Sequence, residues 1–265
     1  MDASSYDQLI SAAAEGNLSR LQQYCQAHKQ DASPETAREM LKAAVVESQP
    51  SVVEFLLQEF PQLELNDEIV HAAACKGSPS VFSLLLARDS SIVNKRLERI
   101  GTPLSSACRT RRPVEFLRYL LEQGADPNKR PEAFGYPLAL AATRYDDTNA
   151  VDLFLEHGAR REHSGALAAA SALGKETMVE YLLGKGLKPD TDAREIAGDH
   201  PLHAALMGGH VGAAKILLHH GASVDVLNRN GKSLQEMADL LQSKGEDRTE
   251  FMTLLSKAGE DRARS

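Results

Sequence analysis

Large apolar residues recur in pairs along the chain at intervals of about 33 residues. Each pair falls within a segment of helical periodicity, and an alanine-rich segment of the same periodicity precedes most pairs. The alternation predicts consecutive pairs of helices, in which the alanines allow close approach and the large residues fill the space between neighbouring pairs. No strand-like alternation of any length is present, so we expect little sheet. The large pairs are Leu56-Leu57, Leu85-Leu86, Leu120-Leu121, Phe154-Leu155, Leu182-Leu183, Leu217-Leu218 and Leu254-Leu255.

Particular residue types mark where these helices begin and end. Thr102 is a natural N-cap, and Pro103 suits the first helical position because its missing N–H costs nothing there. Proline just past the bend predicts that second helices begin at Pro50, Pro79 and Pro113. The first three helix pairs lack a terminal glycine, so we expect the N-terminal half to be more irregular. Elsewhere the second helices are predicted to end in a left-handed residue at Gly124, Gly158, Gly186, Gly221 and Gly259.

Two segments, residues 101–128 and 200–228, are the clearest copies of this pattern, and they resemble ankyrin repeats. The resemblance covers nearly the whole chain, roughly residues 5–260. It implies an all-α ankyrin-repeat solenoid of about eight helix-turn-helix units, with β-turn fingers between units and capping repeats at both ends. The residues that carry the resemblance are Thr102-Pro103-Leu104, Tyr136-Pro137-Leu138, His200-Pro201-Leu202-His203, Gly124-Ala125-Asp126, Gly158-Ala159 and Gly221-Ala222.

The bends between paired helices align at a regular spacing. Successive positions lie 32, 29, 34, 34, 29, 35 and 33 residues apart, at Gly16, Ser48, Gly77, Arg111, Tyr145, Gly174, Gly209 and Gln242. Only some of these residues are glycine, so several bends must use other residues. The alignment predicts one domain over residues 1–265. Its units lie at 5–33, 34–64, 65–97, 98–131, 132–161, 162–195, 196–229 and 230–260, with a frayed tail at 261–265 and fingers at 129–134 and 192–197.

Charge is distributed unevenly along the chain, whose formal net charge is −7. Residues 1–75 carry −8, residues 76–144 carry +6, and residues 145–265 carry −5. The basic middle indicates a surface that attracts an acidic segment, because the planar fork of arginine binds carboxylates bidentately. The alternative is that these basic residues are ordinary solvated surface charges, with local partners at Glu98, Glu115 and Glu132.

In ankyrin repeats the concave face is lined by the fingers and by residues just before the bend. The resemblance therefore implies a partner-binding surface in which the arginines steer an acidic segment beside an apolar patch. For the apolar residues, the alternative is packing against their own fingers. The expected surface comprises Lys76, Arg99, Arg109, Thr110, Arg111, Arg112, Arg130, Phe134, Arg144, Leu173 and Met207.

We therefore expect a monomeric, non-catalytic protein-interaction module, an adaptor or an inhibitor. The acidic overall charge and the aromatic content of 5 %, without Trp, argue against nucleic acid as a partner. The alternative function is binding of a small anionic molecule, or an unusual enzyme, at the same face with Cys75 or His71. A cation at Lys76 would lower the thiol pKa of Cys75, although a small apolar helix residue is the simpler interpretation of this cysteine.

No cofactor or metal is expected. Nucleophile-elbow, phosphate-loop and zinc-hydrolase motifs are absent from the sequence. In the family pattern His71, His203 and His210 fall at positions where histidine supports a loop by hydrogen bonding. Asp190 and the residues after it lack the glycine and glutamate of a calcium loop.

An intracellular location is expected, in the cytoplasm or, as an alternative, the nucleus. Three cysteines without a close pair suit a reducing compartment. No apolar run approaches the length of a membrane span, and the first residues do not resemble a secretory signal.

Overall fold

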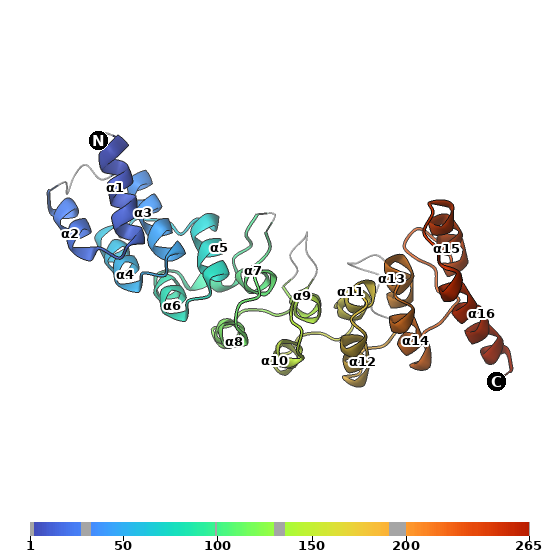
Figure 1. The fold of residues 1–265 in the computed structure, drawn as a ribbon. Helices are drawn as coiled ribbons and strands as arrows, with labels where there is room; N and C mark the ends of the chain where they lie inside the picture. Colours follow the sequence, from blue (N-terminus) through green and yellow to red (C-terminus); the bar gives the residue numbers. More distant parts are fainter. Residues whose placement is uncertain (1–2, 28–32, 99, 130–135, 191–199, 265) are drawn as a thin grey trace. The chain divides into compact units, whose positions relative to one another are not determined.

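The computed structural model describes residues 3–27, 33–98, 100–129, 136–190 and 200–264. The chain divides into two compact units, Met1–Asp126 and Pro127–Ser265, which are described separately. Within the described residues there are sixteen α-helices, arranged as four consecutive pairs in each unit (Figure 1). None of the described helices combines the length and the apolar character needed to cross a membrane.

In the first unit the helices form two layers. The first helices of each pair, α1, α3, α5 and α7, contact one another in order, as do the second helices α2, α4 and α6. A short 3-10 helix, η1 (Ser90–Asn94), follows α6 and contacts α7. The helices are α1 (Ala3–Ala14), α2 (Leu18–Ala27), α3 (Pro34–Val46), α4 (Pro50–Glu59), α5 (Asp67–Lys76), α6 (Pro79–Arg88), α7 (Pro103–Arg109) and α8 (Val114–Glu122).

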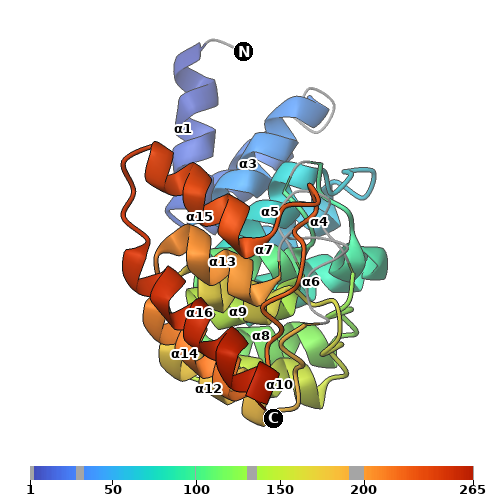
Figure 2. The same cartoon turned by 90° about the vertical axis from the view of Figure 1, so that its right-hand side faces the viewer.

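The second unit repeats this arrangement. First helices α9, α11, α13 and α15 contact in order, and α12, α14 and α16 form the outer layer beside them. Figure 2 shows α13 against α15 and α14 beside α16. The helices are α9 (Pro137–Arg144), α10 (Asn149–Glu156), α11 (Ala166–Ala172), α12 (Glu176–Gly184), α13 (Pro201–Gly208), α14 (Val211–His219), α15 (Leu234–Ser243) and α16 (Thr249–Arg264).

The repeated apolar pairs form the core of both units. The first member of each of the pairs beginning at Leu56, Leu85, Leu120, Phe154, Leu182 and Leu217 is fully buried. Burying a side chain of this size stabilises the fold by about 1.5–3 kcal/mol relative to leaving it exposed. The alanine-rich first helices allow the close packing that was predicted. Among the described residues, extended pairing is limited to one isolated bridge between Leu97 and Gly101.

Most of the predicted helix starts are confirmed. Thr102 caps α7 through the backbone N–H of Ser105 at 3.2 Å, and the Ser105 hydroxyl accepts the N–H of Thr102 at 2.8 Å in return. Pro50 and Pro79 begin their helices. Pro113 is one position early, because it is the N-cap of α8.

The aligned bends are confirmed at six positions by a positive φ, which only glycine adopts without strain. These are Gly16, Ser48, Gly77, Arg111, Gly174 and Gly209. Tyr145 also lies in a bend, between α9 and α10, but its backbone is extended (φ −101°). One aligned position was wrong, because Gln242 lies inside α15. The left-handed residue of that last bend is Gly245 (φ 86°).

The predicted helix-ending glycines are confirmed at four of five positions. Gly124, Gly158, Gly186 and Gly221 have positive φ, whereas Gly259 lies inside α16. That helix continues to Arg264, beyond residue 260, where the last unit was expected to end. The expected finger at 192–197 lies outside the described residues, as does most of the finger at 129–134.

A recurring side-chain contact joins four of the bends to the preceding repeat. The residue after a bend, or shortly after it, donates a hydrogen bond to a backbone carbonyl at the C-terminal end of the preceding first helix. Such carbonyls lack partners within their own helix, so these contacts satisfy them. The pairs are Gln49 to Ala14 (3.0 Å), Arg112 to Lys76 (3.4 Å), Lys175 to Tyr145 (2.8 Å) and Arg248 to Leu206 (2.9 Å).

Candidate functional site

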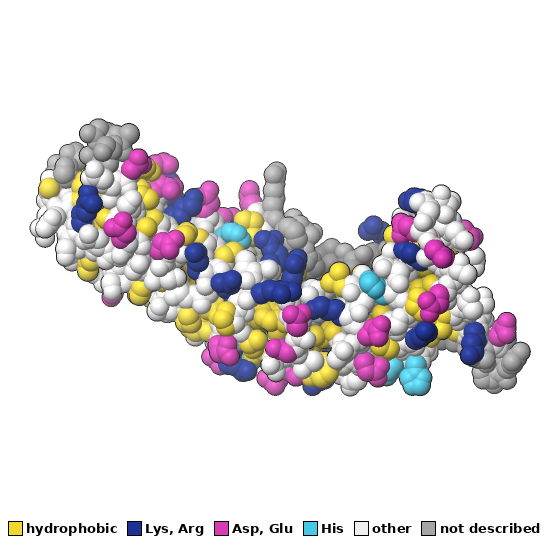
Figure 3. Space-filling view, in the orientation of Figure 1, with side chains coloured by type: hydrophobic (Ala, Val, Ile, Leu, Met, Phe, Trp, Pro, Cys, Tyr) yellow, Lys and Arg dark blue, Asp and Glu magenta, His cyan; other side chains and the backbone are white. Residues whose placement is uncertain are grey.

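Five of the expected site residues lie together at the C-terminal ends of α5 and α7, in the first unit. Lys76 is the last residue of α5, Arg109 is the last of α7, and Thr110 to Arg112 form the bend that follows. Figure 3 shows Lys and Arg side chains gathered over this end of α7. We call Lys76, Arg109, Thr110, Arg111 and Arg112 the basic helix-end patch.

Within this patch Arg112 has a structural role. Its Nε and Nη2 donate to the carbonyl of Thr110 at 3.2 and 2.8 Å, and its Nη1 reaches the carbonyl of Lys76 at 3.4 Å. Its aliphatic stem lies over Gly77, where a Cβ would come within 2.7 Å of the Arg112 Cδ. The side chain therefore ties two repeats together, and its guanidinium is only partly available to a partner.

Arg109 is half-buried beside a small polar cluster on α5 and α7. Its Nη1 lies 3.5 Å from the carbonyl of Ile100. The His71 Nδ1 lies 3.2 Å from the Ser106 hydroxyl, and the Cys75 Sγ lies 3.5 Å from the His71 Nε2. Burial, and then the charge of Arg109, lower the pKa of His71, which favours the neutral form of its ring.

The environment of Cys75 does not activate its thiol. Burial raises the pKa of Cys75, and this outweighs the opposing effects of Thr110, Arg109 and Arg112. Reactive cysteines have lowered pKa values, because the thiolate is the nucleophile. The geometry therefore favours the interpretation of Cys75 as a small packed residue over that of an activated thiol.

Arg111 and Lys76 are the exposed charges of the patch. Arg111 has a left-handed backbone (φ 52°) at the tip of the bend, and its side chain projects into solvent. Neither side chain takes part in an ion pair with the described residues. The expected local partner Glu115 is exposed on α8. The backbone N–H of Glu98 donates to the Asp67 carboxylate at 3.0 Å.

In the second unit the expected residues also lie at the C-terminal ends of first helices. Arg144 ends α9 and is exposed. Leu173 follows α11 with 56 % of its surface exposed, and Met207, near the end of α13, is 44 % exposed. The backbone of Gly208 approaches so closely that a Cβ there would stand 2.5 Å from the carbonyl oxygen of Ala172. Leu173 and Met207 adjoin these two residues, and we call the pair the apolar helix-end patch.

Three expected site residues, Arg99, Arg130 and Phe134, lie outside the described residues.

Two of the histidines expected to support loops have contacts that agree with a structural role. The Nε2 of His203 is 3.2 Å from the carbonyl of Lys232, which confirms its support of the following loop. The ring of His210 packs against Gly174 and Gly208. Among the described residues there is no cluster of three metal-ligating side chains.

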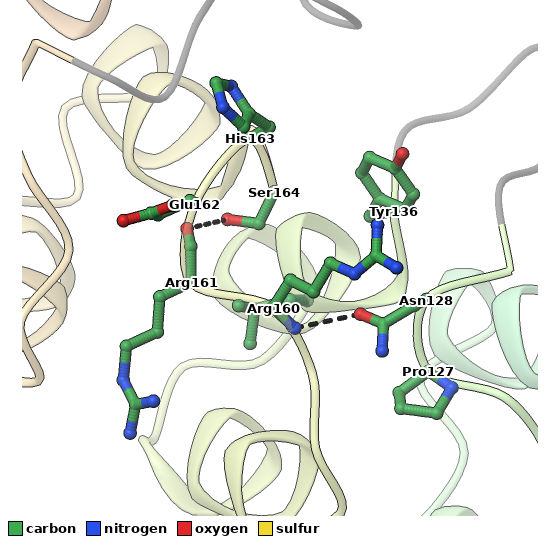
Figure 4. Close-up of a pocket in the computed structure, with 9 residues that line it drawn as sticks. Pro127, Asn128, Tyr136, Arg160, Arg161, Glu162, His163 and Ser164 are labelled. Carbon is green, nitrogen blue, oxygen red and sulfur yellow. Dashed lines mark hydrogen bonds between the residues drawn. The ribbon is translucent and has the colours of Figure 1, made fainter.

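A hollow of about 500 Å³ lies at the opposite, N-terminal ends of first helices in the second unit (Figure 4). Its walls come from Pro127, Asn128, Tyr136 and Leu138, and from the loop of residues 160–164 before α11. We call it the loop hollow. A second hollow of about 630 Å³ shares Glu162 and His163 with it.

Sequence reasoning did not identify the loop hollow as a site. Tyr136-Pro137-Leu138 served only as a marker of the repeat, and Arg160 and His163 were not singled out. A signal was present nonetheless, because two consecutive arginines and a histidine follow the helix-ending Gly158. Their convergence with Tyr136 depends on contacts between repeats, which the pattern alone does not specify.

Comparisons with known proteins agree with the repeat pattern. A family model described as ankyrin repeats (3 copies) matches residues 41–131 and 138–228. Over 192 residues the chain is 28 % identical to human "SH3 and multiple ankyrin repeat domains protein 2". Over 123 residues it is 32 % identical to "Glycerophosphocholine phosphodiesterase GDE1" of Eremothecium gossypii. These matches cover 67 % and 45 % of this chain but only 10 % and 9 % of the two relatives.

Solved structures show the same fold. The human ASB11 ankyrin repeat domain gives a TM-score of 0.60 at 23 % identity, covering 74 % of this chain and 90 % of that one. The ankyrin repeat domain of Bcl-3, from the IkappaB family, gives 0.59 at 23 %, covering 80 % and 99 %. An ankyrin repeat domain from Acinetobacter baumannii gives 0.54 at 22 %, covering 76 % and 98 %. At these identities the likeness concerns the fold.

Proposed function

The chain belongs to the ankyrin-repeat family, and from this premise we propose that it is a non-catalytic module that binds a protein partner through the ends of its first helices. Ankyrin repeats are generally protein–protein interaction modules. One surface is proposed in each unit: the basic helix-end patch in the first, and Arg144 with the apolar helix-end patch in the second. Both lie at positions that the family resemblance implies to face a partner.

The observation that carries the proposal is the exposure of large apolar side chains at the apolar helix-end patch. Leu173 and Met207 are two of the three large apolar residues recorded as exposed in the described chain. Interface centres are enriched in such residues, and methionine adapts readily to different partners. Exposed charges at Lys76, Arg111 and Arg144 would steer an acidic segment toward this end of the helices.

The partner is proposed to be an acidic protein segment, and the role that of an adaptor or an inhibitor. We further propose that the chain acts as a monomer in the cytoplasm and forms a single domain. The alternative of an enzyme at this face has less support, since burial raises the pKa of the Cys75 thiol.

Affinity capture from the native cell extract tests the proposal. The wild type is compared with a variant carrying Lys76→Glu, Arg111→Glu and Arg144→Glu, which spares the structural contacts of Arg109 and Arg112. The matched control carries Arg88→Glu, Arg118→Glu and Lys257→Glu, three exposed charges on α6, α8 and α16. We expect partners held by the wild type and the control and lost by the first variant. Equal capture by all three proteins would refute the proposed surface.

A further inference from the structure

We propose that the loop hollow is a second binding site, which takes an anionic group, a phosphate or a carboxylate, carried on an aromatic ring. It lies at the N-terminal end of α9, whereas Arg144 of the proposed partner surface lies at the C-terminal end. The eight residues of α9 separate the two ends by about 12 Å. The site is therefore separate from the helix-end residues on which the proposed function rests.

The cation of this site is Arg160. Figure 4 shows its guanidinium reaching toward Tyr136 across the hollow, with no ion pair or hydrogen bond recorded from it to any described residue. Its neighbour Arg161 turns the other way, and its Nε donates to the carbonyl of Lys185 at 3.0 Å. Of two consecutive arginines, one is thus engaged in the fold and the other faces the hollow. The guanidinium of Arg160 offers the planar fork that binds a phosphate or carboxylate bidentately.

The position of Arg160 is set by Asn128. The Oδ1 of Asn128 accepts the backbone N–H of Arg160 at 2.8 Å, and its Nδ2 donates to the carbonyl of Gly158 at 2.9 Å. On the far side, the Ser164 hydroxyl donates to the carbonyl of Arg161 at 3.1 Å. Both ends of the short loop are therefore fixed before a ligand arrives, which lowers the ordering cost of binding.

The remaining walls suit an aromatic ring. Leu138 and Pro127 are buried beneath the hollow, and the half-buried ring of Tyr136 forms one side. Tyr136 is also the N-cap of α9 and makes no side-chain cap hydrogen bond, so the positive end of the helix adds to the attraction of an anion. The volume of about 500 Å³ falls within the range of small-molecule sites.

Acidic side chains in the neighbouring second hollow favour binding of the anion in the loop hollow instead. The Glu162 carboxylate points away from Arg160 in Figure 4. The second hollow is lined by Asp190 and Asp225 as well as Glu162, so an anion is disfavoured there. His163 stands between the two hollows, exposed and with a positive φ of 59°. The difference in charge between the two hollows orients the ligand. Its anionic group lies toward Arg160, and the rest of it lies toward Tyr136 or solvent.

The test is an NMR titration of the isotope-labelled full chain with phenyl phosphate, inorganic phosphate and phenol. We expect phenyl phosphate to shift the amide signals of residues 158–164 and to bind more tightly than either of the other probes. Arg160→Gln should weaken phenyl phosphate binding by about ten- to a hundredfold, the loss of a hydrogen-bonded charge. Arg144→Gln, which removes the same charge at the other end of α9, should leave it unchanged.

Two results would overturn the site. One is the absence of localised shifts with phenyl phosphate, and the other is an equal loss of affinity in Arg160→Gln and Arg144→Gln, which indicates general charge attraction. A short phosphotyrosine peptide then identifies the source of the ligand. Binding about tenfold tighter than that of phenyl phosphate assigns the site to a phosphorylated protein segment, and equal binding assigns it to a small molecule.

Discussion

The side chain of Asn128 accepts the backbone N–H of Arg160 at 2.8 Å, and so connects one repeat of the second unit to the loop of the next. Asn94 makes the same pair of contacts in the first unit, with Gly124 at 2.7 Å and Asp126 at 2.8 Å. The two asparagines are 34 positions apart, one repeat. Each asparagine amide therefore hydrogen-bonds one carbonyl and one N–H of the loop that follows a helix. Those backbone groups have no partner within the helix, and buried backbone polar groups need one.

Asn128→Ala removes both contacts, and we expect it to lower the free energy of unfolding by about 1–3 kcal/mol, the sum for two ordinary hydrogen bonds. Asn94→Ala should cost a similar amount, because its geometry is nearly the same. Urea unfolding followed by circular dichroism measures both losses. An unchanged stability in both variants would show that these contacts do not hold the repeats together.

Arg111→Gly is expected to raise stability by about 0.5–1 kcal/mol. A non-glycine residue at positive φ is strained by about 1–2 kcal/mol, and the larger entropy that glycine loses on folding offsets only part of this relief. Ser48→Gly is the control, since it has the same backbone conformation (φ 54°) without the charge. Both variants should unfold at higher urea concentrations, and only Arg111→Gly should weaken partner capture. Destabilisation of both would contradict the assigned bend conformation.

Gly208→Ala is expected to destabilise the second unit by about 1–3 kcal/mol, the usual cost of overpacking. The new Cβ would stand 2.5 Å from the backbone carbonyl of Ala172, which is unable to move aside as a flexible side chain would. Gly184→Ala is the matched change, because Gly184 also ends its helix but has nothing within 4 Å of the new Cβ. Thermal unfolding should place Gly184→Ala at or above the wild type and Gly208→Ala below it. The reverse order would contradict the close approach of α11 and α13.

The stability of the second unit should depend on pH through Asp152. Burial alone would raise the pKa of Asp152, but hydrogen bonds from Lys185 and Tyr181 and the charge of Lys185 outweigh it, so the pKa is lowered. A lowered carboxyl pKa stabilises the fold above the unfolded pKa of about 3.9, and this contribution is lost as pH falls through the folded value. Asp152→Asn should therefore be less stable than the wild type at pH 7 and should approach it at pH 2. A difference that does not change with pH would exclude this contribution.

Much of the fold was predictable because it depends on residues whose effect is local in the sequence. Thr102, Pro103 and the glycines at the helix ends act within one turn of the chain, so their roles follow from sequence. The eighth bend failed because Gly245 comes three residues after the aligned position, and α15 runs past Gln242. The spacing of earlier repeats did not reveal that longer helix.

The candidate site was less predictable, because the sequence places residues on a helix end but does not say what they contact. Arg111 and Arg112 looked equivalent, yet one projects into solvent and the other binds the carbonyls of Thr110 and Lys76. The same holds for Arg160 and Arg161 in the loop hollow. In both cases the difference arises from a neighbouring repeat about 24–36 residues away.

Hydrogen–deuterium exchange of the full chain, with and without its captured partner, tests the central claim most directly. Binding at the ends of the first helices predicts slower exchange around residues 109–112, 144–146, 172–174 and 207–209, because a partner there restricts opening of these bends. The second helices of these pairs, α8, α10, α12 and α14, should exchange at the same rate in both states. Protection concentrated on those second helices, with the first-helix ends unaffected, would contradict the account.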